Sequence, residues 1–402
     1  MNENLYALLA GHFPAVADAP CLILPNGRRV SYAEMESQSA RYGNLLVAAG
    51  LKKGDRVAAQ VEKTPEALYL YLGCLRAGLV FLPLNPACQR REVECFLDDA
   101  KPGLFVCRPE TLEQAQELAW AARMPLVHDL GVRGEGSLAA TAAEMPEAFD
   151  TAQSAGSDLA ALLYAFGTTG RAKGVMLSHR NLAANARVLH DYWGFRPGDV
   201  LLHMLPTFHA HGLFVATHCA LLNGSPILLE PEFDPQRALR LMQDATVFMG
   251  VPTYYTRLLQ EKALTREAVA HMRLFISGSA PLLPETLNEF HARTGHTVLE
   301  RYGMTEGGML TSNPLEGERR VGTVGLPLPG TEVRVVGEDD ALLPAGGIGH
   351  IQVRGDNVFM GYWQMPEKTR EAFTAEGFFR TGDMGRFDAD GYLAIIGRNT
   401  PR

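Results

Sequence analysis

Residues 162–182 read LLYAFGTTGRAKGVMLSHRNL and give the strongest local signal in the chain. A buried strand runs into a loop of glycine, threonine and lysine, and a helix is expected to begin near Ser178. Glycines let backbone N–H groups converge on an anion, the hydroxyls of Thr168 and Thr169 add donors, and Lys173 adds positive charge. The pattern therefore predicts a phosphate-binding loop, although GTTG alone is equally typical of an exposed turn.

Two other nucleotide-binding motifs are disfavoured. The Walker A pattern fails because Ala172, the sixth residue when Gly167 is counted as the first, stands where that motif has glycine, and no Ser or Thr follows Lys173. Residues 134–139 are close to a dinucleotide fingerprint, but they follow no convincing strand and lie in an aperiodic segment. An ATPase of the Walker class and a dinucleotide-binding fold are thus not expected.

Helices and strands alternate on both sides of the loop. Residues 32–50 space apolar positions three and four apart and end at a glycine, residues 55–61 form a strand, and residues 64–78 form a helix capped by Thr64. This βα rhythm is typical of a largely parallel sheet covered by helices.

Changes in composition divide the chain. Residues 129–157 are rich in Gly, Ala, Ser and acidic residues and have no strong period, as a connector would. From Gly322 the pattern becomes short alternating strands with glycine turns. We expect an α/β protein with two stacked parallel-sheet subdomains and a smaller β-rich, distorted-barrel subdomain, bounded at 1–155, 156–320 and 321–398 and followed by a tail at 399–402.

Composition narrows the class of ligand. The 402 residues are 47% apolar and 20% charged, which suits two or three packed units. A net charge of −8 disfavours nucleic acid and anionic membranes as partners. The six cysteines form no C-x-x-C pair and are expected to be reduced and mostly buried. With no targeting or transmembrane pattern, the sequence predicts a cytoplasmic protein that binds a small molecule.

Four further motifs follow in the order 275–283 (FISGSAPLL), 300–308 (ERYGMTEGG), 361–369 (GYWQMPEKT) and 378–398 (FFRTGDMGRFDADGYLAIIGR). Together with the loop, they resemble the adenylate-forming superfamily of acyl-CoA synthetases, nonribosomal adenylation domains and luciferases. The resemblance covers essentially the whole chain and is greatest to malonyl-CoA synthetases. It implies an enzyme that uses ATP and Mg²⁺ to convert a small dicarboxylate, malonate or methylmalonate, to its acyl adenylate and then to the CoA thioester.

The resemblance also assigns a nucleotide site. Thr168, Thr169, Gly170 and Lys173 belong to the loop over the β- and γ-phosphates, Thr305 contacts the α-phosphate and Glu306 binds magnesium, so that Lys173, Thr305 and Glu306 form the catalytic set. Asp383 accepts hydrogen bonds from both ribose hydroxyls, and Arg398 contacts the ribose. Gly278, Ser279, Ala280, Arg301 and Tyr302 match the walls of the adenine slot, with Glu300 beside them, although Tyr302 is equally plausible as a core aromatic residue.

For the acid, the resemblance points to Arg273. An arginine before the SGSA segment binds the distal carboxylate in malonyl-CoA synthetases, but synthetases for other acids often have a basic residue there too. Thr207, His209, Ser277, Met304 and Met309 are expected to border the acyl pocket, unless the methionines only fill the core. The H-x-H pair at His209 and His211 has no third ligand suitably spaced, so a metal site there is improbable.

The chain departs from the family in two places. Ala165 and Phe166 replace a threonine and a serine of the usual loop, and the sequence stops at the hinge, before the C-terminal lid domain. We therefore expect nucleotide and acid to bind, weak adenylation, and inefficient thioester formation by this chain alone. Two alternatives remain: an adenylation protein that loads an acyl carrier protein, and a non-catalytic adenylate-binding relic.

Overall fold

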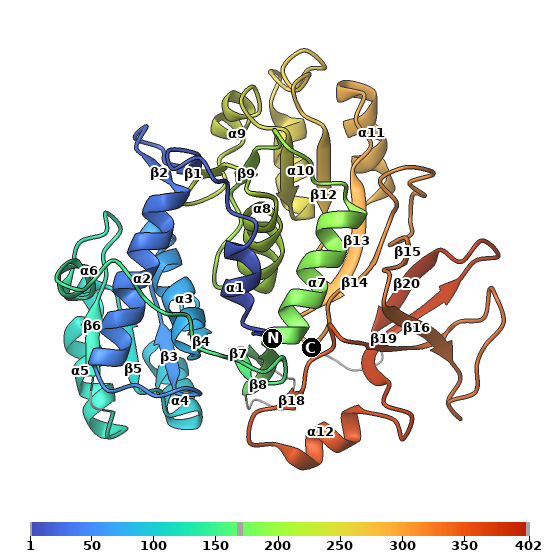
Figure 1. Cartoon of the computed structure of the whole chain (residues 1–402). Coiled ribbons are helices and arrows are strands. Elements are labelled where there is room, and N and C mark those ends of the chain that lie inside the picture. The colour runs from blue at the N-terminus through green and yellow to red at the C-terminus, as the bar shows by residue number, and fades with distance from the viewer. Residues whose placement is uncertain (1, 125, 167–171, 399–402) are drawn as a thin grey trace.

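Three β-sheets organise the chain in the computed structural model, which describes residues 2–124, 126–166 and 172–398 (Figure 1). The first sheet contains, in spatial order, β18 (Gly361–Tyr362), β8 (Ala172–Ser178), β7 (Leu159–Phe166), β4 (Val80–Pro83), β3 (Arg56–Ala59), β5 (Leu104–Cys107) and β6 (Leu126–Asp129). Its helices are α2 (Tyr32–Ala48), α3 (Pro65–Ala77), α4 (Arg90–Ala100), α5 (Leu112–Ala121), α6 (Ser137–Ala143) and a 3₁₀ turn at Pro109–Thr111.

The second sheet contains, in order, β15 (Leu326–Pro327), β14 (Gly308–Ser312), β13 (Leu299–Met304), β12 (Leu274–Ser277), β11 (Val247–Gly250), β9 (Leu201–His203), β10 (Ile227–Leu229), β1 (Pro20–Ile23) and β2 (Arg29–Ser31). Its strands from β13 to β1 are parallel. The helices around it are α1 (Leu5–Ala10), α7 (His179–Tyr192), a π-helix (His211–Thr217), α8 (His218–Asn223), α9 (Pro235–Leu241), α10 (Pro252–Gln260) and α11 (Pro284–Thr294).

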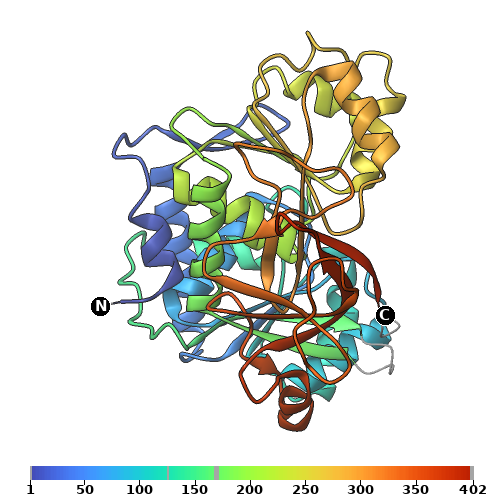
Figure 2. The same ribbon diagram turned by 90° about the vertical axis from the view of Figure 1, so that its right-hand side faces the viewer.

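The third sheet is antiparallel and lies to one side of the two larger layers in Figure 1, so it faces the viewer in the view turned by 90° (Figure 2). Its order is β16 (Thr331–Val336), β17 (Gly349–Gly355), β19 (Phe379–Phe387) and β20 (Leu393–Arg398), and α12 (Pro366–Ala372) lies between β18 and β19 in sequence. The predicted α/β class with a smaller β-rich part is confirmed. Among the described residues, no pairing of β20 with β16 closes the third sheet into the expected barrel.

The segment around the phosphate loop differs from the expected strand, loop and helix. β7 and β8 form an antiparallel hairpin whose register runs from Leu159 opposite Ser178 to Phe166 opposite Ala172. Strand β8 is covered on both faces, because Val175 and Leu177 belong to one hydrophobic cluster and Met176 packs against another. α7 begins after Ser178 as predicted, with the hydroxyl accepting from Asn181 N–H in a capping box. Strand β8 therefore lies between β7 and α7, so the helix does not follow the predicted loop directly.

The sheets also exchange segments across the expected boundary at 155. β7 and β8 pair into the first sheet, whereas β1 and β2, near the N-terminus, belong to the second. The two layers share one hydrophobic core, in which the ring of Tyr71 on α3 lies 6.1 Å from that of Phe214 on the π-helix. The expected connector at 129–157 contains α6, which packs against α2.

The predictions about the cysteines and about membrane-spanning segments can both be compared with the structure. All six cysteines are free, and four of them are buried, with Cys95 exposed and Cys88 partly so. Within the described residues, none of the helices combines the length and apolar composition that crossing a membrane requires.

Candidate nucleotide and acid site

The site lies at the edge where the parallel strands of the second sheet end. β9, β12 and β13 end at His203, Ser277 and Met304, and the segments that follow them carry most of the predicted site residues. Ligands of open α/β sheets bind at this carboxyl edge because loops from neighbouring strands converge there.

Arg301, on β13, is a buried cation at this edge of the sheet. The residue is 3% exposed, and its Nε and Nη2 have no hydrogen-bond partner among the residues that the structure describes. Ser277 Oγ and His211 Nε2 are also buried and unpartnered within that part of the chain. Burial lowers the pKa of Arg301 to about 9, so the guanidinium is charged at neutral pH. A buried cation with free donors is a site for an anion.

The backbone at the end of β12 makes room for this guanidinium. A Cβ on Gly278 would lie 2.3 Å from Arg301 Cζ, so only glycine lets the side chain lie flat against the strand end. The next residue, Ser279, has a φ of 74°, which is an uncommon backbone conformation for a residue other than glycine. Its hydroxyl lies 3.4 Å from His211 Nδ1. Strain of this kind is concentrated at functional sites.

Glu306 and Lys173 are linked by a residue that sequence reasoning did not select. Tyr362 on β18 donates its hydroxyl to Glu306 Oε1 at 3.2 Å, and Lys173 Nζ lies 5.4 Å from the centre of the same ring. Burial raises the pKa of Glu306. Tyr362 belongs to the GYWQMPEKT motif, which is the sequence signal that could have identified it as a site residue. It aims the carboxylate and holds the lysine beside it.

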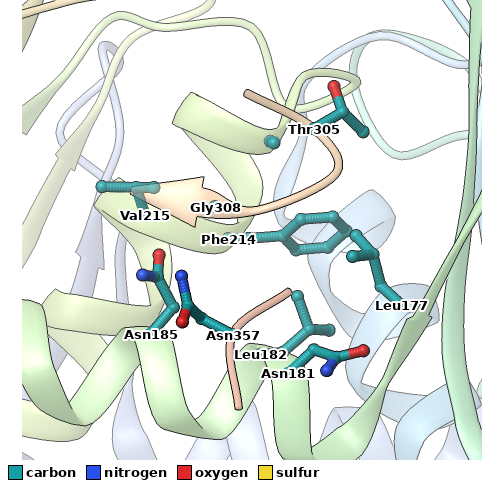
Figure 3. A pocket seen from close by; sticks show the side chains of 10 residues that line it. Leu177, Asn181, Leu182, Asn185, Phe214, Val215, Thr305, Gly308 and Asn357 are labelled. Atoms are coloured by element: carbon teal, nitrogen blue, oxygen red, sulfur yellow. The ribbon is translucent and has the colours of Figure 1, made fainter. Parts of the chain in front are cut away.

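The segment that carries Thr305 and Glu306 is held by asparagines from outside it. Asn185 on α7 accepts from Met309 N–H at 3.0 Å and donates to the Met309 carbonyl at 2.9 Å, and Asn357 donates to the Gly307 carbonyl at 2.6 Å. Figure 3 shows Asn185 and Asn357 side by side, with Thr305 on the other side of the strand that carries Gly308. These bonds fix the turn between β13 and β14, and neither asparagine was predicted.

Asp383 is engaged by its own chain. Tyr302 donates its hydroxyl to Asp383 Oδ2 at 2.5 Å, and Arg398 donates from Nε to Oδ1. The structure therefore brings the two residues predicted for the ribose together with Tyr302, one of those predicted for the adenine slot. Two ribose hydroxyls would have to share or replace these donors at the carboxylate.

Glu300 points away from Arg301, because successive residues of a strand face opposite sides. Its Oε1 accepts from Leu282 N–H at 3.0 Å, whereas Oε2 is buried with no partner among the described residues. Burial raises the pKa of Glu300 to about 7. The side chain supports the turn after Ala280.

The structure does not bring Arg273 to the site. Arg273 precedes β12 and so lies at the amino end of the strand, about 17 Å of extended chain from Gly278. Its Nη2 and Nε donate to Asp199 at 2.6 and 3.0 Å, and Asp199 precedes β9 at the same edge. The prediction that Arg273 binds the distal carboxylate is therefore wrong in this structure, since its guanidinium already has a carboxylate partner.

The remaining acid-site residues lie on the loop after β9 and around β13. Thr207 and Phe208 line a small cavity that also contacts Tyr71 of α3. The His209 ring lies 4.5 Å from that of Phe208, and burial lowers the pKa of His209. Met309 is buried on β14, and Met304 ends β13 and packs against the core as a partly buried residue. Their contact with an acid stays a prediction.

Glu306 is the residue predicted to bind magnesium. Among the described residues, no three His, Cys, Asp or Glu side chains are grouped to hold a metal by themselves. One buried carboxylate suits a magnesium ion that arrives on ATP, because Mg²⁺ combines one or two acids with phosphate oxygens. Thr168, Thr169 and Gly170 lie outside the described residues. The backbones of Ala165 and Phe166 belong to β7, paired with Lys173 and Ala172.

Residues 12–363 match the AMP-binding enzyme family. The chain belongs to this family. It is 33% identical to a malonate–CoA ligase of Arabidopsis thaliana, over 94% of this chain and 68% of the relative, and 34% identical to a sulfoacetate–CoA ligase of Cupriavidus necator, over 98% and 78%. The crystal structure of ATP-bound MatB from Rhodopseudomonas palustris has a TM-score of 0.97 and 52% identity, over 99% of this chain and 79% of that one.

The AMP-binding family and the malonate–CoA ligase relatives identify the chain as an acyl-CoA synthetase, as predicted, and one of the similar structures is bound to ATP. The chain spans between 61% and 78% of the length of four curated relatives.

Proposed function

We propose that the chain binds ATP with magnesium together with malonate or methylmalonate, and activates one carboxylate of the acid as the acyl adenylate for transfer to CoA. In this reaction a carboxylate oxygen bonds to the α-phosphorus and pyrophosphate leaves. The observation that carries the proposal is the buried Arg301, with two side-chain nitrogens that have no partner among the described residues.

Arg301 takes the role first predicted for Arg273. A second carboxylate on the acid would be an anionic partner for the Arg301 guanidinium, which has none among the described residues. Charge-assisted hydrogen bonds of this kind are about twice as strong as neutral ones. The names of the relatives support this choice, because malonate and sulfoacetate are small acids with a second anionic group. A monocarboxylate such as acetate would leave the buried cation uncompensated.

The other residues position the nucleotide. Lys173 neutralises phosphate charge, Thr305 donates to the α-phosphate, and Tyr362 aims Glu306 at the ion. Magnesium, when bound with ATP, shields the phosphate oxygens, and Glu306 would hold it. Asp383 holds the ribose after exchanging its present donors.

The test is calorimetric binding of two non-hydrolysable adenylate mimics, malonyl and acetyl, to this chain. Binding does not require turnover, so the assay is independent of any residues beyond the chain. We expect the malonyl mimic to bind about tenfold or more tightly than the acetyl mimic. Equal affinities for the two would contradict the proposal.

A further inference from the structure

Lys63 reaches from the first α/β layer to the carboxyl edge of the second sheet. It lies between β3 and α3, directly before the helix cap at Thr64. Its Nζ is 2.8 Å from His203 Nδ1, 2.8 Å from the His203 carbonyl and 2.9 Å from the Leu205 carbonyl. An ammonium group has three N–H donors, so each one is used. Lys63 is thus a cross-layer anchor for the chain that leaves β9.

His203 extends this anchor to the start of the π-helix. Its Nε2 lies 2.9 Å from the Gly212 carbonyl, which only accepts, so Nε2 carries the proton and Nδ1 accepts from Lys63. Thr217 donates its hydroxyl to the same carbonyl at 2.9 Å. A Cβ on Gly212 would lie 2.1 Å from the carbonyl oxygen of Pro206, so the helix start rests on the preceding backbone.

Residues 204–211, which we term the acid-site loop, lie between these two anchored points. The loop carries Thr207 and His209, both predicted to border the acid, and ends at His211 beside Arg301. If the ammonium were removed, His203 Nδ1 and the Leu205 carbonyl would lose the donor that Lys63 supplies, whereas the His203 carbonyl would keep its hydrogen bond from Glu230 N–H. Buried acceptors without donors are unfavourable. The loop would then shift or open.

We propose that Lys63 and His203 are positioning residues that fix the acid-site loop, and through it the specificity for the acid, from outside the site. Neither residue belongs to the set predicted to bind a ligand. This inference rests on the proposed function only for the identity of the acid. The geometry of the anchor is independent of it.

The test uses Lys63→Met, which keeps the aliphatic stem and removes the three donors. Amide hydrogen exchange on the ligand-free protein is expected to become faster in residues 204–212 and to stay unchanged in the third sheet, which contains β16, β17, β19 and β20. The affinity for the malonyl mimic is expected to fall by about tenfold or more, while that for ATP changes by less than about twofold. Lys53→Met is the matched control, since Lys53 is about half exposed and bonds only to Asp158 and Gln153 at the surface.

A second variant guards against a folding defect. His203→Asn keeps an acceptor for Lys63 but loses the donor to Gly212, so faster exchange is expected at the helix start alone. Unchanged exchange in the acid-site loop of Lys63→Met, or an equal loss of affinity for ATP and the malonyl mimic, would overturn the inference. If the wild-type chain shows no preference for the malonyl mimic, the proposed function fails, and hydrogen exchange still decides on the anchor.

Discussion

Replacement of Arg301 by glutamine separates recognition of the acid from stability of the fold. Arg301 is 3% exposed and has two unpartnered nitrogens in the described part of the chain, so its charge is buried without compensation. Removal of such a charge is neutral or stabilising. The free energy of unfolding of Arg301→Gln, measured by urea denaturation, is therefore expected to equal or exceed that of the wild type.

Ligand binding is expected to respond in the opposite direction. A hydrogen bond to a charged group contributes about 1.5–3 kcal/mol, so the malonyl mimic should bind Arg301→Gln about 10- to 150-fold more weakly by calorimetry. Affinity for the acetyl mimic should stay within about threefold, because it has no second carboxylate. Equal losses for the two mimics would refute the assignment of Arg301 to the distal carboxylate.

Arg273→Gln is the matched control and should show the reverse pattern. Arg273 pairs with Asp199, whose side chain is 2% exposed, and the variant leaves that carboxylate without its cation. Asp199 keeps hydrogen bonds from Thr246 and Arg196, so we expect a destabilisation of about 2–3 kcal/mol, below that for a fully buried pair. The preference for the malonyl mimic should survive. Its disappearance in this variant would restore Arg273 as the binding residue.

Three further predictions follow from the site. Gly278→Ala places a Cβ 2.3 Å from Arg301 Cζ, so the guanidinium must shift. The preference for the malonyl over the acetyl mimic should then fall about tenfold or more in the same calorimetric assay. An unchanged preference would mean that the guanidinium can move without loss of binding. Tyr362→Phe removes the donor to Glu306 and should weaken binding of ATP about 2- to 10-fold with magnesium present but not without it; equal effects in both conditions would contradict the positioning role. Burial raises the pKa of Glu300 from 4.5 to about 7, so the folded chain retains a proton that the unfolded chain releases, and stability falls as pH rises through this window. Urea denaturation of Glu300→Gln should lack this fall, which reaches about 3 kcal/mol by neutral pH, and an identical pH profile for variant and wild type would count against it.

The α/β class, the third sheet and the start of α7 could be predicted because they rest on local patterns. The cap at Ser178 and the glycine turns after Gly322 act within a few residues. The exchange of β1 and β7 between sheets could not be predicted, because strand order depends on packing between segments far apart in sequence.

In the acid site, too, local patterns could be predicted and contacts between distant segments could not. Motif position alone favoured Arg273. However, β12 is one continuous strand that crosses the sheet, so the residues before it and after it lie at opposite edges of the sheet. Arg301 and Arg273 differ in partners and burial, which only the fold reveals. Lys63 was invisible to motif reasoning because its three acceptors lie about 140 residues away.

The most direct measurement is a crystal structure of this chain with the malonyl adenylate mimic. The account predicts that an oxygen of the distal carboxylate lies about 2.7–2.9 Å from Arg301 Nε or Nη2, with Arg273 still bound to Asp199. A distal carboxylate held by another cation, or directed into solvent while Arg301 remains unpartnered, would contradict it.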